Sequence, residues 1–145
     1  TILGTVAVEK PELVEAACSK FDENIIVSID ARDRLVATRG WLQKSQVTAS
    51  ELAEQMVNLG VKRFIYTDIS RDGTLTSPNF EAVAELLSQV SVPIIAAGGI
   101  SSVYHLIRLT ELGVEGAIVG QAMYTGDIKL ADAFGISIDE LVGRT

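Results

Sequence analysis

The sequence predicts a parallel α/β fold, and three observations lead to this expectation. Short apolar strands alternate with amphipathic helices at roughly 25–35 residues per unit, as in right-handed βαβ units with helices on the outside. The predicted strands are near-continuous apolar runs, often β-branched, which is typical of strands buried on both faces. Each run ends in a polar or glycine-rich stretch. The 145 residues fit one domain, which we expect to span the whole chain.

The apolar runs place five strands. They are expected over Ile2-Leu3, Ile25–Asp30, Phe64–Tyr66, Ile94–Ala97 and Ala117–Val119. A short hairpin is expected around Leu35-Val36-Ala37, in the polar stretch that follows the second strand.

Start and stop signals place the helices between the strands. Pro11 suits a first helical turn, and this helix is expected to run to about Lys20. Thr48 and Glu51 have the spacing of a capping box, and Gly60 ends the helix that follows. Further helices are expected from Ser77-Pro78 onward, over about 102–112, 121–124 and 129–134, with a last turn over 138–142.

Composition narrows the kinds of function. Net charge is −7, which argues against a nucleic-acid partner, because such binding needs a clustered basic surface. No apolar run approaches the roughly 18 residues of a membrane helix. Cys18 and His105 are each the only residue of their kind, so no intrachain disulfide and no structural metal site is expected. Without a targeting segment, a reducing, cytoplasmic location fits.

The stretch after the strand Phe64–Tyr66 is the first candidate site, because strand carboxyl ends open onto the ligand crevice of parallel α/β proteins. It holds Asp72 and Gly73. Asp30 ends the preceding predicted strand, and neighbouring strands lie about 4.8 Å apart, so the two carboxylates are expected to face one pocket. Such a pair can divide into acid and base. Thr67 could orient one of them. Solvated turn residues are the alternative interpretation.

Two glycine turns form a second candidate site. Gly98-Gly99 joins a strand to a helix and is followed by Ser101, and Gly120-Gln121 ends the last strand. Glycine lets the backbone approach a ligand, and a helix N-terminus offers donors to a phosphate. Tight strand-to-helix turns, which also need glycine, are the alternative.

The loop Arg39-Gly40-Trp41 offers a cation and an aromatic ring. Together they could clamp a planar anion by ion pairing and stacking; a solvated Arg beside a half-buried Trp is the alternative. His105 is expected to be an ordinary helix-face residue. The side chains of Asp33, Asp68 and Arg71 are expected to be solvated.

The chain also contains a short internal sequence repeat. Residues 1–7 and 117–123 share an apolar pair, a glycine and a run of small residues, and Gly4 and Gly120 are 116 positions apart. This is close to half of a (β/α)8 barrel of about 250 residues.

Together these motifs resemble one enzyme family. They are Ser28-Ile29-Asp30, Arg39-Gly40-Trp41, Thr67–Leu75, Ala97–Ser102 and Gly120–Tyr124. Their order and spacing resemble the C-terminal part of the histidine-pathway phosphoribosylformimino-5-aminoimidazole carboxamide ribotide isomerases, over essentially the whole chain. The resemblance implies a (β/α)8 TIM barrel of two similar halves, with this chain covering about strands 4 to 8.

The resemblance also implies a chemistry. The family converts an aminoaldose into an aminoketose by an acid–base Amadori rearrangement, without metal or cofactor, on a ribotide with a phosphate at each end. Asp72 would be the general acid, and Asp30 and Thr67 would assist at the reacting ribose. Arg39 and Trp41 would cover the substrate. One phosphate site would be built by Gly73, Thr74, Gly98, Gly99, Ser101, Gly120 and Gln121, and the second would include Gly4 and Thr5.

Some family features have no counterpart here. The general base, an Asp at the end of the first barrel strand, is not found, and the chain opens on the apolar Thr1-Ile2-Leu3. We therefore expect a fragment that is inactive alone, with exposed edge strands that favour self-association. Gln121 stands where a basic or small residue is common in the family, so phosphate contact there is expected from the backbone.

Two alternative functions remain open. One is the cyclase subunit of imidazole-glycerol-phosphate synthase, which lacks the Arg-Gly-Trp loop in this form. The other is a non-catalytic phosphate-binding half-barrel.

Overall fold

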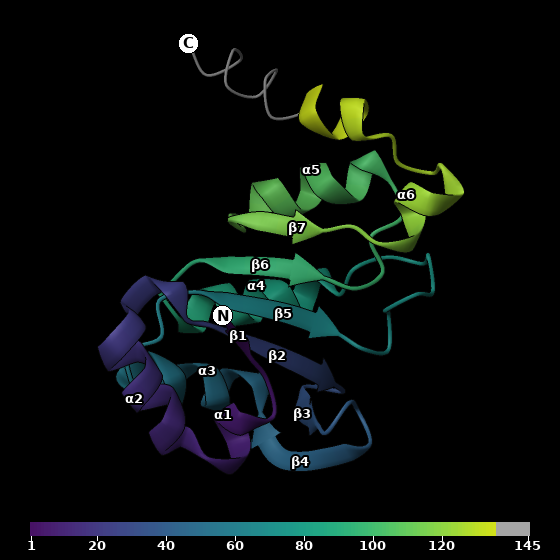
Figure 1. Ribbon diagram of the computed structural model, residues 1–145. Helices are drawn as coiled ribbons and strands as arrows, with labels where there is room; N and C mark the ends of the chain where they lie inside the picture. The colour runs from purple at the N-terminus through teal and green to yellow at the C-terminus, as the bar shows by residue number, and fades with distance from the viewer. Residues whose placement is uncertain (136–145) are drawn as a thin grey trace.

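Strands and helices alternate along the chain, which confirms the α/β class (Figure 1). The structure is a computed structural model in which residues 1–135 are described. The strands are β1 (Ile2–Leu3), β2 (Ile26–Arg32), β3 (Leu35–Thr38), β4 (Gln43–Thr48), β5 (Phe64–Asp68), β6 (Ile94–Ala97) and β7 (Gly116–Ile118). The helices are α1 (Val6–Glu9), α2 (Pro11–Phe21), a 3-10 turn (Asp22–Asn24), α3 (Ala49–Asn58), α4 (Phe80–Gln89), α5 (Val103–Leu112) and α6 (Gln121–Thr125). Residues 130–135 are also helical, and the turn predicted over 138–142 lies outside the described residues.

The five predicted strands form one parallel array in the order β1, β2, β5, β6, β7. Near its carboxyl end β2 also pairs antiparallel with β3, and β3 pairs with β4, which is the hairpin expected around residues 35–37. The arrows of β2, β5 and β6 point to the same side in Figure 1. The loops that carry the candidate residues therefore gather at one edge of the sheet.

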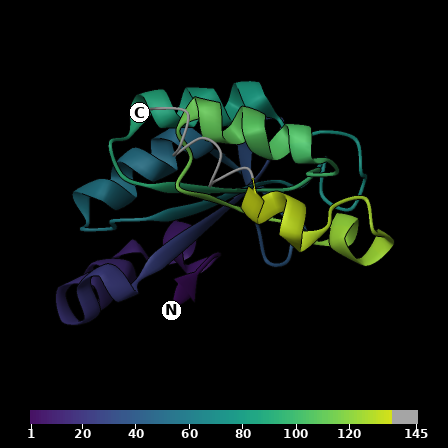
Figure 2. The same ribbon diagram turned by 90° about the horizontal axis from the view of Figure 1, so that it is seen from above.

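Strand register separates two faces of this sheet. On one face Val27, Phe64 and Ile94 lie in a row, and each is 0% exposed. Figure 2 shows α3, α4 and α5 together on one side of the sheet, so this face and these helices enclose the core. Because side chains alternate along a strand, the pair Asp30 and Thr67, three residues further along β2 and β5, lies on the opposite face.

Capping residues begin and end the helices largely as expected. The capping box at α3 is complete, since the Thr48 hydroxyl accepts from the Glu51 N–H and the Glu51 carboxylate accepts from the Thr48 N–H. Ser102 caps α5, and Gly113 ends it in a left-handed conformation with φ +94°. Such a conformation favours glycine, which has no Cβ to clash.

The predicted start of α4 at Ser77-Pro78 is wrong by two residues. The helix begins at Phe80, and its N-cap is Asn79, whose Oδ1 accepts from the Ala82 N–H at 3.1 Å. The Asn79 amide is also held by Asp68, a contact from outside the helix. A tertiary contact thus decides which of several polar residues acts as the cap.

Within residues 1–135, no helix has the length and apolarity that crossing a membrane requires.

Candidate functional site

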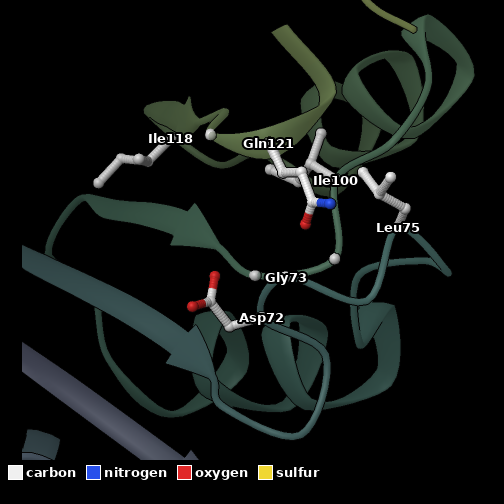
Figure 3. Close-up of a pocket in the computed structure, with 9 residues that line it drawn as sticks. Asp72, Gly73, Leu75, Ile100, Ile118 and Gln121 are labelled. Atoms are coloured by element: carbon white, nitrogen blue, oxygen red, sulfur yellow. The ribbon is translucent and has the colours of Figure 1, made fainter. Parts of the chain in front are cut away.

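Three loops at the carboxyl edge of the sheet enclose a cavity of about 270 Å³ (Figure 3). They follow β5, β6 and β7. The lining residues are Asp72, Gly73, Leu75, Gly98, Gly99, Ile100, Ile118, Gly120 and Gln121. Six of them were predicted as site residues. They lie up to 49 positions apart in the sequence, and the fold brings them together at this cavity.

Two polar side chains extend into the space between these loops. In Figure 3 they are the carboxylate of Asp72 and the side-chain amide of Gln121. Gln121 lies over Gly73, since a Cβ at that glycine would be 3.7 Å from Gln121 Oε1. Asp72 is exposed to solvent. The cavity thus combines an accessible carboxylate with several stretches of glycine backbone, which suits proton transfer next to a bound anion.

The glycines of the second loop are required by how closely the loops pack. Gly98 and Gly99 have φ of +93° and +74°. A Cβ at Gly98 would lie 2.7 Å from the carbonyl oxygen of Asp68, and one at Gly99 would overlap the carbonyl oxygen of Ser77. The loop after β6 therefore rests directly on the backbone of the loop after β5.

Asp68 corrects a prediction. Its side chain was expected to be solvated, but the residue is only 4% exposed. Its carboxylate accepts hydrogen bonds from the Ser70 N–H at 3.0 Å, the Ser70 hydroxyl at 2.5 Å and the Asn79 amide at 2.7 Å. The spacing held a signal, since an Asp followed two residues later by Ser is typical of a side chain that bonds its own turn.

The other two residues expected to be solvated, Asp33 and Arg71, are more exposed than Asp68. Asp33 has a 76% exposed side chain, and its carboxylate lies 3.6 Å from Lys44 Nζ. Arg71 is half-buried and donates to the Ser77 hydroxyl at 3.3 Å.

A second, much smaller cavity of about 20 Å³ lies around Asp30. Gly4, Thr5 and Trp41 also line it, so these predicted residues come together away from Asp72. The Trp41 ring N–H donates to Asp30 Oδ2 at 2.9 Å, and the Ser28 hydroxyl donates to Oδ1 at 3.2 Å. The carboxylate of Asp30 is therefore half-buried and engaged by the Trp41 indole.

Thr67 lies beside Asp30, as its register partner on β5. The two residues share the sheet face opposite the helices, so a ligand seated there would meet both.

The Arg39 guanidinium pairs with a glutamate of α1. Its Nε donates to Glu9 Oε1 at 2.7 Å, and its backbone N–H donates to the Thr5 hydroxyl at 2.8 Å. Arg39, Gly40 and Trp41 have φ of 53°, 63° and 70°. Three consecutive left-handed residues, two of them not glycine, mark this loop as strained.

Thr74 and Ser101 do not line the larger cavity. The Thr74 hydroxyl donates to the Arg71 carbonyl at 2.7 Å. The Ser101 N–H donates to His105 Nδ1 at 3.2 Å, so the imidazole accepts at Nδ1 and carries its proton at Nε2. Burial lowers the pKa of His105, which favours this neutral form. His105 lies on α5, as expected, but it also holds the loop that precedes the helix.

Among the described residues, no group of three or more His, Cys, Asp or Glu side chains gathers in a way that could hold a metal ion.

Comparison with known proteins gives a family and a set of relatives. Residues 1–129 match the family model described as "Histidine biosynthesis protein". A relative from Dehalococcoides mccartyi (strain ATCC BAA-2266 / KCTC 15142 / 195), named 1-(5-phosphoribosyl)-5-((5-phosphoribosylamino)methylideneamino) imidazole-4-carboxamide isomerase, is 59% identical over 133 residues. These residues are 92% of this chain and 56% of the relative.

Two further relatives carry the same isomerase name. The protein of Trichodesmium erythraeum (strain IMS101) is 60% identical over 135 residues, which are 91% of this chain and 52% of the relative. The protein of Synechocystis sp. (strain ATCC 27184 / PCC 6803 / Kazusa) is 54% identical over 135 residues, or 91% of this chain and 53% of the relative. The chain thus spans about half the length of the curated relatives it matches.

Proposed function

Because the chain belongs to the histidine biosynthesis protein family, we propose that it provides the acid and phosphate-binding side of an aldose–ketose isomerase. Its substrate would be an imidazole carboxamide ribotide with two phosphates, since the name of the relatives contains two phosphoribosyl groups. One observation carries the proposal. The accessible carboxylate of Asp72 shares a cavity with the glycine turns that follow three neighbouring strands.

In this proposal the larger cavity receives one phosphate. The backbone at Gly98, Gly99 and Gly120 lines it, while the Gln121 amide extends into it. Helix α5 begins shortly after Gly98-Gly99, with Ser102 as its N-cap. Peptide N–H groups and a helix N-terminus suit a dianion. Such local donors are needed because the net charge of −7 repels anions overall. Gly4 and Thr5, on the smaller cavity, belong to the site for the second phosphate.

Asp72 acts as the general acid. It gives a proton to the furanose ring oxygen, the bond from that oxygen to the anomeric carbon breaks, and the electron pair of the amino nitrogen forms a C=N bond. Loss of the C2 proton to a base then yields an enolamine, and protonation at C1 with loss of the enol O–H proton gives the aminoketose. A positioned proton donor accelerates such a step by about 10²–10⁴-fold. Asp30 and Thr67, paired across β2 and β5, contact the reacting ribose.

Arg39 and Trp41 cover the substrate once it is bound. Both side chains are engaged elsewhere, since Arg39 pairs with Glu9 and Trp41 donates to Asp30. A bound substrate must replace these two contacts. The strained backbone of residues 39–41 makes such a rearrangement less costly, because part of the strain is released.

The base that removes the C2 proton is assigned to no residue of this chain. We propose that it comes from the part of the relatives' length that this chain does not match. The 145-residue chain tested alone is therefore expected to show no turnover.

A chimaera tests this function directly. This chain would replace the matching part of the Dehalococcoides mccartyi isomerase, to which it is 59% identical, and conversion of the aminoaldose to the aminoketose would be followed. We expect turnover within about tenfold of the unaltered relative, because the proposed acid and phosphate contacts are supplied by this chain. A chimaera that folds and remains monodisperse but is inactive, beside an active relative, would refute the proposal.

A further inference from the structure

Asp68 connects the two ends of the loop after β5 and the start of α4, a role that the proposed function does not include. Its Oδ1 accepts from the N–H and hydroxyl of Ser70, at the start of the loop after β5. Its Oδ2 accepts from the Asn79 amide at 2.7 Å, at the end of the same loop. Asn79 in turn caps α4 through the Ala82 N–H. One carboxylate thus ties both ends of the loop to each other and to the helix.

The backbone of Asp68 holds the proposed acid itself. Its carbonyl oxygen accepts from the Asp72 N–H at 3.2 Å and from the Arg71 N–H at 3.0 Å. The same oxygen supports the next loop, where a Cβ at Gly98 would come within 2.7 Å of it. The backbone position of Asp72, and its distance from the glycine turns, therefore depend on Asp68.

Asp68 does not itself reach the cavity. It is 4% exposed and is not among the residues that line the cavity. A buried carboxylate that accepts three hydrogen bonds is fully engaged in holding its donors, and losing one of them would leave a costly unpaired group. Its contribution must act through the groups that it holds.

We propose that Asp68 is a positioning residue, which fixes the loop of residues 69–79 so that Asp72 is held in its place beside the Gly98-Gly99 turn. This inference rests on the proposed function for its effect on catalysis, and on the hydrogen bonds alone for its effect on the loop. A misplacement of a catalytic group by about 1 Å can cost about 10²-fold in rate.

The substitution Asp68→Asn removes one interaction whichever way the new amide turns. In asparagine an NH2 donor replaces one of the two carboxylate oxygens. This NH2 group then faces either the Ser70 N–H or the Asn79 amide, and both of these are donors as well. Turning the Asn79 amide around would relieve the clash but would break the cap on the Ala82 N–H. In the chimaera, we expect kcat to fall about 10–100-fold, with KM changed by less than about threefold.

The reciprocal pair of substitutions, Asp68→Asn with Asn79→Asp, should restore activity. The amide at position 68 would then donate to the carboxylate at position 79, whose second oxygen accepts from the Ala82 N–H. All four hydrogen bonds and the net charge are kept, and the charge moves to a helix N-terminus, where it is favourable. Asn79→Asp alone should impair the protein, because it sets two carboxylates against each other. We expect kcat of the pair within about threefold of the unsubstituted chimaera.

Amide hydrogen exchange provides a readout that does not depend on catalysis. The exchange rate of the amides in residues 70–74 should rise in each single variant. It should return to the rate of the unsubstituted protein in the double variant. A residue that only stabilises the fold would lower the melting temperature when substituted, without changing kcat of the folded protein.

The inference is overturned if Asp68→Asn leaves kcat within about twofold of the unsubstituted chimaera, or if kcat of the double variant is no higher than that of either single variant. An inactive unsubstituted chimaera would refute the proposed function, while unchanged exchange in Asp68→Asn would refute the positioning role.

Discussion

At the scale of residues, burial separates the roles of two aspartates, one at the end of β5 and one in the loop that follows. Asp68 is 4% exposed and accepts from three donors, whereas Asp72 is exposed on the cavity. A carboxylate that is engaged in holding its neighbours is unsuited to giving a proton to a ligand, while an accessible one can do so. Asp30 is an intermediate case, because it is half-buried and accepts from the Trp41 indole N–H.

One prediction at this scale concerns pH. Burial lowers the pKa of His105 below its usual value of about 6.5. Between the two pKa values the unfolded chain binds the proton and the folded one does not, so stability falls as pH falls through this window. His105→Asn keeps an acceptor for the Ser101 N–H but does not titrate.

The measurement is the melting temperature at about pH 7.5 and at about pH 5.5, above and below the usual pKa of histidine. We expect a smaller drop on acidification in the His105→Asn variant than in the unsubstituted protein. Since the chain has one histidine, carboxylates contribute equally to both proteins and cancel in the comparison. Equal drops would show that the imidazole does not couple folding to pH here.

At the scale of elements, caps position the loops that carry the site. Helix α3 begins where its sequence predicts, because both partners of its capping box lie within four residues. Helix α4 begins two residues later than predicted, because its cap is chosen by a contact with Asp68, 11 positions away. Local signals thus suffice for α3 but not for the helix that follows the site.

The capping box at α3 predicts a stability difference between two threonines. Thr48→Ala should destabilise the protein by about 1 kcal/mol, and should lower its melting temperature by about 2–4 °C, because the Glu51 N–H loses its acceptor. Thr110→Ala is the matched control. Its hydroxyl bonds back to the Leu106 carbonyl on the exposed side of α5, and alanine is a better helix former. If both variants melt alike, the cap does not contribute as inferred.

At the scale of the whole molecule, the sheet has one face under α3, α4 and α5 (Figure 2) and an opposite face that bears Asp30 and Thr67. Ile2 and Ile118, on strands β1 and β7, are 58% and 47% exposed. The chain spans about half the length of the relatives it matches. The self-association expected from exposed edge strands stays a prediction.

The strands were predictable because a buried apolar run is visible locally, as at Phe64–Tyr66 and Ile94–Ala97. The larger cavity was also largely predictable, because carboxyl ends of parallel strands must share an edge. The burial of Asp68 was missed, although Ser70 gave a local signal, since it also depends on the Asn79 amide 11 residues away. The pairing of Arg39 with Glu9, across 30 residues, has no local signal.

The central claim is that Asp72 is the acid of an isomerase. Its most direct test is steady-state kinetics of the chimaera with Asp72→Asn, beside Asp33→Asn as a control in an exposed turn. The account predicts that kcat falls at least about 100-fold in the first variant, with KM changed only a few-fold, because binding by the glycine turns is kept. The control should be unchanged. Retained kcat in Asp72→Asn, or a loss confined to KM, would contradict the account.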